Sequence, residues 1–150
     1  SPNAYLRIYS KDLDLGGYCE SSARDGILVP YVKDEDLWVE ASYPNGLVVG
    51  MLLRSGQETI GMPEVNLRVE EKLSSDVLTF VFERIGFSGW CSLELLSGEK
   101  SVYIDRIPPW RSHIKLKTYG YFEKAPDYRL RCERDYGYVE KRSFKRLEVF

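Results

Sequence analysis

The sequence predicts an antiparallel β-sandwich of roughly 8–10 strands, with a closed β-barrel as the alternative architecture. Apolar and polar residues alternate with a period of two along most of the chain, and turn signals recur about every 8–12 residues. Helical periodicity is almost absent, so at most one short helix is expected, near residues 63–74. At 150 residues the chain has the usual length of one domain, and we expect a single β domain over residues 1–150.

The N-terminal part of the chain shows the clearest alternation. Residues 4–10 read AYLRIYS, in which aliphatic side chains alternate with tyrosine and arginine. Residues 37–43 read LWVEASY and alternate in the same way, with Trp38 on the polar face. The dipeptide Asn45-Gly46 follows directly, and both residue types accept the positive φ of a type I′ turn. We therefore expect a tight hairpin between residues 37–43 and the apolar run that follows.

Further strands are expected downstream. A second hairpin surrounds Ser97-Gly98. The segment 63–74 is ambiguous, because Pro63 and Glu64 suit a helix start whereas the aliphatic residues after them alternate, and we interpret it as a strand. The remaining predicted strands are 27–33, 77–83, 113–122, 128–133, 138–142 and 144–150.

The cysteines and the hydropathy exclude several classes of protein. Cys19, Cys91 and Cys132 lack a C-x-x-C spacing and are odd in number, so they form neither a zinc signature nor a full disulfide framework. Alternation turns Cys91 and Cys132 inward, and we expect reduced thiols that fill the core, with one disulfide as the alternative. The longest apolar run, residues 47–53, is far shorter than the roughly 20 residues of a membrane helix. We expect a soluble protein with no membrane span.

Catalytic and metal-binding signals are weak. His113 is the only histidine, and alternation places it on the solvated face of its strand, where a catalytic triad is not expected. Residues 12–17, DLDLGG, match three positions of a calcium-binding loop, but Gly16 and Ala23 occupy two of the ligand positions. We therefore predict a turn there, no metal, no cofactor and no enzymatic activity. An enzyme of unrecognised class is an alternative.

Charge is distributed unevenly along the chain. Residues 1–104 contain 9 Lys and Arg against 16 Asp and Glu, a net charge of −7, whereas residues 105–150 contain 12 against 7, a net charge of +5. If the fold separates these parts, the molecule presents oppositely charged surfaces to a partner or to itself. We expect instead that the chain folds back and interleaves the two signs.

A Tyr-Gly-Tyr triplet occurs twice in the basic part, at residues 119–121 and 136–138. On the predicted strand 113–122, Lys117 and both tyrosines of the first triplet face outward. Gly120 then falls on the inner face, where a missing side chain permits a kink or a close backbone approach.

The short KAP connection at residues 124–126 predicts a hairpin between strands 113–122 and 128–133. Two registers keep exposed residues opposite exposed residues. In one, Tyr121 faces Arg129; in the other, Tyr121 faces Arg131. Such cross-strand pairs contribute roughly 0.2–1 kcal/mol each, so the stripe has a purely structural explanation.

The functional interpretation is that rigid tyrosines beside cations form a contact surface, as at protein interfaces. We predict a non-catalytic interaction module that engages a protein partner, or a second copy of itself, through an exposed Tyr/Arg/Lys sheet face in the C-terminal third. The predicted binding residues are Lys117, Tyr119, Tyr121, Arg129, Arg131, Tyr136 and Tyr138.

Two further binding classes are alternatives. A carbohydrate-binding, lectin-like domain is supported by Trp38 and Trp90 as candidate sugar-stacking residues. Single-stranded nucleic-acid binding is the other, although a sequence pI near 5.6 counts against it, because domains that bind phosphate backbones are normally basic.

Overall fold

The structure, a computed structural model, describes residues 4–11, 14–19, 27–28, 35–55, 59–60 and 64–143. These residues form strands and no helix, which confirms the predicted all-β class. The strands are β1 (Ala4–Tyr9), β2 (Asp14–Cys19), β3 (Ile27–Leu28), β4 (Leu37–Ser42), β5 (Leu47–Leu53), β6 (Thr59–Ile60), β7 (Asn66–Ser74), β8 (Val77–Ile85), β9 (Cys91–Ser97), β10 (Lys100–Ile107), β11 (His113–Lys117), β12 (Asp127–Arg134) and β13 (Gly137–Arg142).

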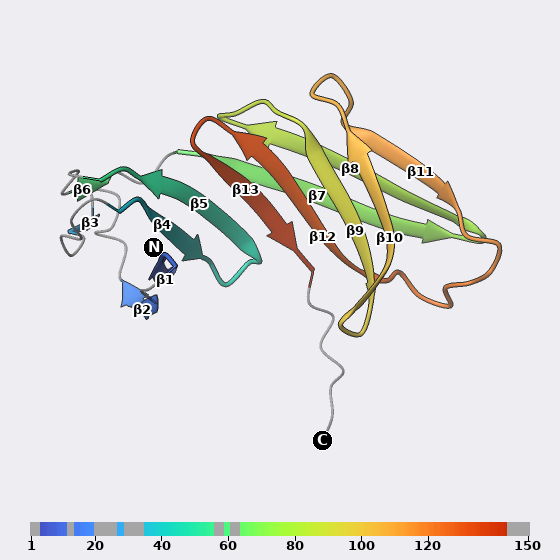
Figure 1. The fold of residues 1–150 in the computed structure, drawn as a ribbon. Coiled ribbons are helices and arrows are strands. Elements are labelled where there is room, and N and C mark those ends of the chain that lie inside the picture. Colours follow the sequence, from blue (N-terminus) through green and yellow to red (C-terminus); the bar gives the residue numbers. More distant parts are fainter. Residues whose placement is uncertain are drawn as a thin grey trace.

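The described strands form two main antiparallel sheets. One sheet has eight strands in the order β10-β9-β12-β13-β5-β4-β1-β2, and the other has three in the order β11-β8-β7. A separate pair joins β3 and β6. The three-stranded sheet packs against one half of the larger sheet as a sandwich (Figure 1). Both main sheets end in edge strands within the described part of the chain, so the barrel alternative is wrong.

The core lies between the two main sheets, and strand alternation sets its composition. In β8 the buried side chains are those of Leu78, Phe80 and Phe82, at every second position. They meet the inward-facing residues of β9, β12 and β13. The ring of Phe80 packs edge-on against Tyr128 of β12, with 5.3 Å between ring centroids. Full burial of a large apolar side chain stabilises a fold by roughly 1.5–3 kcal/mol, which makes this layer its main support.

Both predicted hairpins are present, but the first uses a different turn. The main-chain N–H of Gly46 donates to the carbonyl oxygen of Tyr43 (3.0 Å), and the Asn45 side chain accepts from the main-chain N–H of Leu47 (3.1 Å). Gly46 has a positive φ of 88°, whereas Asn45 does not lie in the positive region. A type I′ turn requires positive φ at both residues, so that prediction was wrong.

The predicted hairpin between residues 113–122 and 128–133 is wrong. β11 ends at Lys117 and pairs with β8, while β12 pairs with β9 and β13. The chain stops being extended at Tyr119 and Gly120, whose φ angles are 51° and 74°. Residues 118–126 therefore cross from one sheet to the other, and neither predicted Tyr–Arg register forms.

The structure confirms the strand expected within residues 63–74, contradicts part of the turn expected at residues 12–17, and does not describe one other predicted strand and part of a second. The ambiguous segment 63–74 contains strand β7, as we interpreted it. The turn predicted at residues 12–17 is wrong from Asp14 onward, because β2 starts there and pairs with β1. The strand predicted at 144–150 and residues 29–33 of another lie outside the described residues.

Cys91 and Cys132 form a disulfide, so the expectation of reduced thiols is wrong for this pair. The two residues lie directly opposite each other on β9 and β12. Both are buried, as alternation predicted. Strand alternation does not predict this pair, because β9 and β12 are adjacent in the sheet although the two cysteines are 41 residues apart in the chain.

Candidate binding surfaces

The seven predicted binding residues do not form one stripe. Arg129, Arg131 and Tyr138 lie on the outer face of the eight-stranded sheet, on β12 and β13. Lys117 ends β11, and the tyrosines of the first triplet follow it in the crossing segment. Tyr136 lies in the turn between β12 and β13, where the guanidinium of Arg54 sits 4.8 Å from its ring centroid. The residues therefore belong to separate surfaces. These surfaces differ in how far their side chains already contact other residues of the fold.

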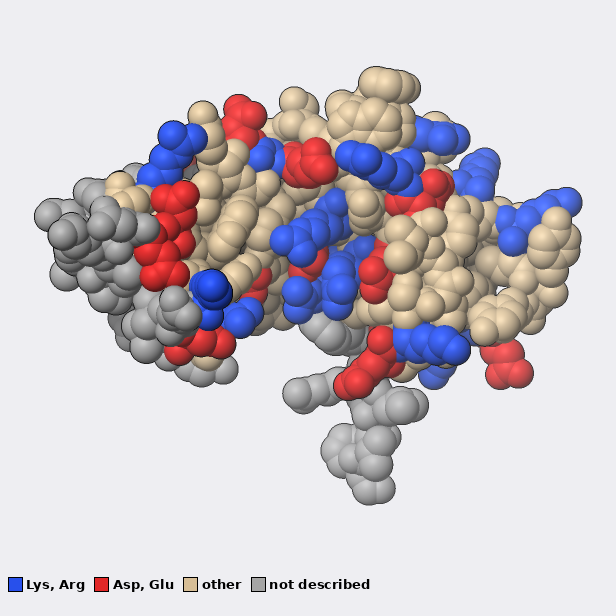
Figure 2. All heavy atoms as spheres, viewed as in Figure 1, with Lys and Arg blue, Asp and Glu red and all other residues tan. Residues whose placement is uncertain are grey.

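We call the outer-face group the sheet face; it comprises Arg129, Arg131, Tyr138, Glu140 and Arg142. Glu140 is fully buried although it is acidic, and its carboxylate accepts a hydrogen bond from Nε of Arg142. Arg129 approaches the same carboxylate at 3.8 Å and that of Glu94 on β9 at 3.6 Å. Buried charges are tolerated only when they are paired. Figure 2 shows basic side chains gathered at the middle of this face with acidic ones among them.

Tyr138 is enclosed by its neighbours on the sheet face. Its hydroxyl donates to the carboxylate of Glu40, the guanidinium of Arg131 lies 3.7 Å from its ring centroid, and Trp38 packs at 6.2 Å. Burial, followed by the hydrogen bond to Glu40, raises the pKa of Tyr138 above its usual range. The sheet-face residues are therefore engaged in contacts that hold neighbouring strands together.

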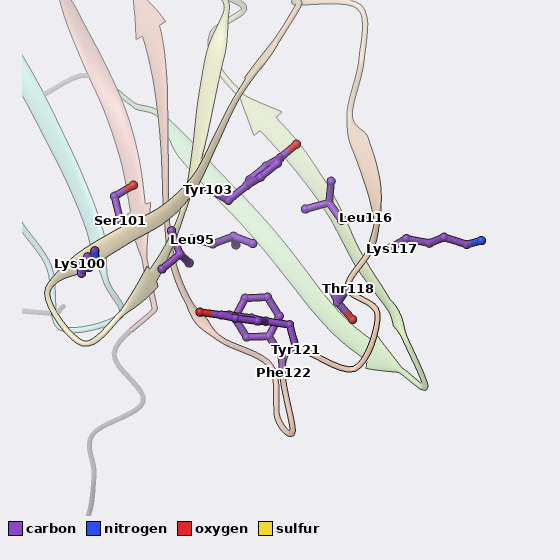
Figure 3. Close-up of a pocket in the computed structure, with 10 residues that line it drawn as sticks. Leu95, Lys100, Ser101, Tyr103, Leu116, Lys117, Thr118, Tyr121 and Phe122 are labelled. Atoms are coloured by element: carbon purple, nitrogen blue, oxygen red, sulfur yellow. The ribbon is translucent and has the colours of Figure 1, made fainter.

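A second surface is a groove between the edge strands of the two sheets, β10 and β11. We call it the edge groove. It encloses about 460 Å³. Figure 3 shows Tyr103 of β10 and Leu116 of β11 on opposite sides, with Tyr121 and Phe122 of the crossing segment at one end. The lining residues are Leu95, Lys100, Ser101, Val102, Tyr103, Leu116, Lys117, Thr118, Tyr121 and Phe122.

A β-bulge in β10 contributes to this lining. Ser101 pairs with Leu96 and Tyr103 with Leu95, so Val102 is an extra residue between them. The side chains of Val102 and Tyr103 are both partly buried against the core. Bulges commonly re-aim side chains at sheet edges. Burial, with a smaller effect of the Asp105 carboxylate, raises the pKa of Tyr103.

Tyr121 of the first triplet lines the edge groove, and Tyr119 lies two residues before it in the crossing segment. Tyr119 is 82% exposed and Tyr121 is 69% exposed. The Tyr121 ring packs edge-on against Phe122 with 4.9 Å between centroids, and the Lys117 ammonium lies 6.0 Å from the Tyr119 ring centroid. A neighbouring hollow of about 460 Å³, lined by residues 96–98 and 121–127, shares Tyr121 and Phe122 as its wall.

The buried hydroxyl of Thr118 is a further feature of the groove wall. Its main-chain N–H donates to the carbonyl oxygen of Asp76 at 2.6 Å, which ties the wall to the β7–β8 turn. Its Oγ1 atom finds no hydrogen-bond partner among the described residues. A buried hydroxyl without a partner costs roughly 1–3 kcal/mol, so this wall is not optimised for stability alone.

The sequence did not reveal the groove. Leu95 belongs to the core and Leu116 packs against it, as the alternation of their strands favours. What opens the groove is the separation of β10 and β11 into different sheets, which depends on long-range pairing. The bulge at Val102 also contributes to the lining, and alternation through β10 does not predict it.

His113 is exposed on β11, where alternation placed it. Among the described residues, no group of three or more His, Cys, Asp or Glu side chains is arranged to hold a metal ion. Asp12 of the calcium-like stretch lies outside them. Within the same residues, no helix is long and apolar enough to cross a membrane.

Comparison with known proteins identifies no relative: no protein-family model matches the chain, and no curated protein matches it significantly.

Proposed function

We propose that the protein is a non-catalytic interaction module that binds a protein partner through the edge groove, with Tyr119 and Tyr121 as the main contacts. The observation that carries this proposal is that the highly exposed Tyr121 lines an apolar groove between two sheet edges, with the still more exposed Tyr119 two residues before it. Tyrosine is enriched among the residues that dominate interface energies. A groove lined mainly by apolar side chains accepts an apolar side chain of a partner.

The backbone at Tyr119 supports the proposal. Its φ of 51° lies in the left-handed region, which costs a bulky side chain roughly 1–2 kcal/mol. Asparagine or glycine fits this position better. The ring does not offset the cost by burial, because it is mostly exposed. Residues in sparsely populated backbone conformations cluster at functional sites, and Tyr136, in the turn between β12 and β13, shares this conformation with a φ of 57°.

The sheet face supports the proposal by contrast. Arg129 and Arg131 were predicted as binding residues, but their guanidinium groups contact Glu140, Glu94 and Tyr138. A partner there would have to compete with these contacts. Tyr119 and Tyr121, by contrast, are highly exposed, so most of each ring is open to a partner.

Site-directed photocrosslinking tests the proposal. Benzoylphenylalanine replaces Tyr121 in one sample and, as a control, Val81 in another. Val81 is exposed on the outer face of the three-stranded sheet, away from the groove lining. After irradiation in an extract of the native source, we expect one discrete adduct from position 121, either with another protein or with a second copy, and none from position 81. The adduct should disappear when Tyr119→Ser is added. Equal adducts at both positions, or none at position 121, would contradict the proposal.

A further inference from the structure

Two tryptophans meet at the end of the sandwich opposite the edge groove. Trp90 precedes β9 and Trp110 lies between β10 and β11, in loops that Figure 1 shows at the same end of the molecule. Their ring centroids are 6.0 Å apart and the rings are inclined by 72°. Trp110 is 82% exposed, so most of its indole is open to solvent. Sequence reasoning had considered Trp90 but not Trp110.

One arginine of β8, Arg84, holds both loops in place. The Arg84 guanidinium donates to the carbonyl oxygens of Gly89 (3.1 Å), Pro108 (3.1 Å) and Arg111 (2.9 Å). The carbonyl oxygen of Trp90 also accepts from the main-chain N–H of Glu133 at 2.8 Å. The loops that carry the indoles are thus ordered before any ligand arrives, which reduces the entropic cost of binding.

Polar groups of opposite charge lie beside the indoles. The Arg106 guanidinium sits 5.0 Å from the Trp90 ring centroid, and its Nη2 atom lies 3.5 Å from a carboxylate oxygen of Glu133. Both side chains are largely exposed, at 64% and 70%. The site therefore combines an aromatic platform, a hydrogen-bond donor and a hydrogen-bond acceptor.

We propose that Trp90, Trp110, Arg106 and Glu133 form a binding site for a neutral pyranose sugar. The axial C–H groups of a pyranose form an apolar, slightly positive face that complements the negative face of an indole. Its hydroxyl groups both accept and donate, which suits a guanidinium beside a carboxylate. The charges of Arg106 and Glu133 cancel, which favours a neutral ligand over an anionic one. Arg106 already lies against Trp90, which disfavours a cationic ligand and leaves the highly exposed Trp110 ring as the stacking face.

This site is independent of the edge groove, and either proposal can fail without the other. The test uses the full chain on an array of neutral and acidic glycans, followed by titration calorimetry with the best neutral oligosaccharide and with a thymidine decanucleotide. We expect saturable binding of a neutral glycan that falls at least tenfold for Trp110→Ala and at least threefold for Glu133→Gln. Val81→Thr, on the outer face of the three-stranded sheet, serves as the control and should bind as the parent does.

Loss of folding would not explain weaker glycan binding by Trp110→Ala, because Trp110 is too exposed to support the core. Three outcomes would overturn the proposal: no neutral glycan bound, binding that survives Trp110→Ala, or binding only of acidic glycans or of the decanucleotide.

Discussion

At the scale of single residues, Gly50 and Tyr138 show how the second Tyr-Gly-Tyr triplet is used. A Cβ atom built on Gly50 would lie 2.1 Å from the Tyr138 ring, so the ring occupies the space that a side chain at residue 50 would need. The triplet's own glycine, Gly137, faces the Gly50 carbonyl oxygen, which a Cβ would approach to 2.0 Å. The repeated triplet is visible in the sequence, but the sequence does not show that Tyr138 is buried whereas Tyr136 is exposed. That difference depends on a glycine almost ninety residues away.

Replacement of Gly50 tests this packing. Gly50→Ala should lower the free energy of unfolding by about 1–3 kcal/mol, because the added methyl displaces the Tyr138 ring. In a Tyr138→Ala background the same substitution should cost much less, since the ring is gone. Urea denaturation of the four proteins of this double-mutant cycle measures the difference. An equal cost in both backgrounds would show that the ring and Gly50 do not compete for space.

Buried tyrosines also predict a loss of stability in alkaline solution. Burial, with a smaller contribution from the Glu71 charge, raises the pKa of Tyr128 to about 12, and the pKa of Tyr138 is raised as well. Unfolded tyrosine ionises near pH 10, so above that pH the unfolded chain binds fewer protons than the folded chain. Stability is therefore fully present below about pH 10 and falls as the pH rises towards 12, by up to about 1.4 kcal/mol per pH unit for each tyrosine.

Urea denaturation at pH 8, 10 and 11 checks this expectation, and Tyr128→Phe should make the decline shallower. A free energy of unfolding that stays constant or rises over this range would mean that these hydroxyls ionise equally easily in both states.

At the scale of elements, the disulfide joins β9 to β12, the second and third strands from the β10 edge of the larger sheet. Its two cysteines are 41 residues apart in the chain, so the bond restricts the unfolded state considerably. Reduction should lower the free energy of unfolding by about 2–4 kcal/mol. Urea denaturation with and without a phosphine reductant measures the effect, and mass spectrometry confirms reduction. The variant Cys91→Ala/Cys132→Ala is the control and should not respond to the reductant. A fully reduced protein with an unchanged urea midpoint would contradict the stabilising role.

The crossing segment shows where local pattern stops being informative. Alternation from Ile114 to Leu116 correctly predicts β11. The same alternation of residue types continues in the sequence through Tyr121, although the strand ends at Lys117. The backbone nevertheless turns at Tyr119, against the preference of a bulky residue. Because sequential strands usually pair, a hairpin with β12 was the natural expectation. Because that hairpin does not form, Tyr119 and Tyr121 lie in the segment that crosses between the sheets and not on a sheet face.

At the scale of the whole molecule, the sandwich class and most of its strands could be predicted from periodicity and turn residues. The strand order could not, because β9 lies beside β12 and β5 beside β13 through pairings between distant segments. The interleaving of charge follows from that order. Arg129 of the basic part meets Glu94 of the acidic part only because β12 and β9 are neighbours. Of the candidate residues, Arg129, Arg131 and Tyr138 contact other side chains of the sheet face, whereas Tyr119 and Tyr121 leave most of their rings exposed.

The central claim is that Tyr119 and Tyr121 are retained for binding rather than for stability. The most direct test is a titration of the crosslinked partner with the Tyr121→Ser variant, alongside urea denaturation of the same sample. We expect the affinity to fall at least about thirtyfold, equivalent to roughly 2 kcal/mol, while the free energy of unfolding changes by less than about 0.5 kcal/mol. Unchanged affinity together with a loss of about 1 kcal/mol of stability would contradict the claim and would make the tyrosines structural.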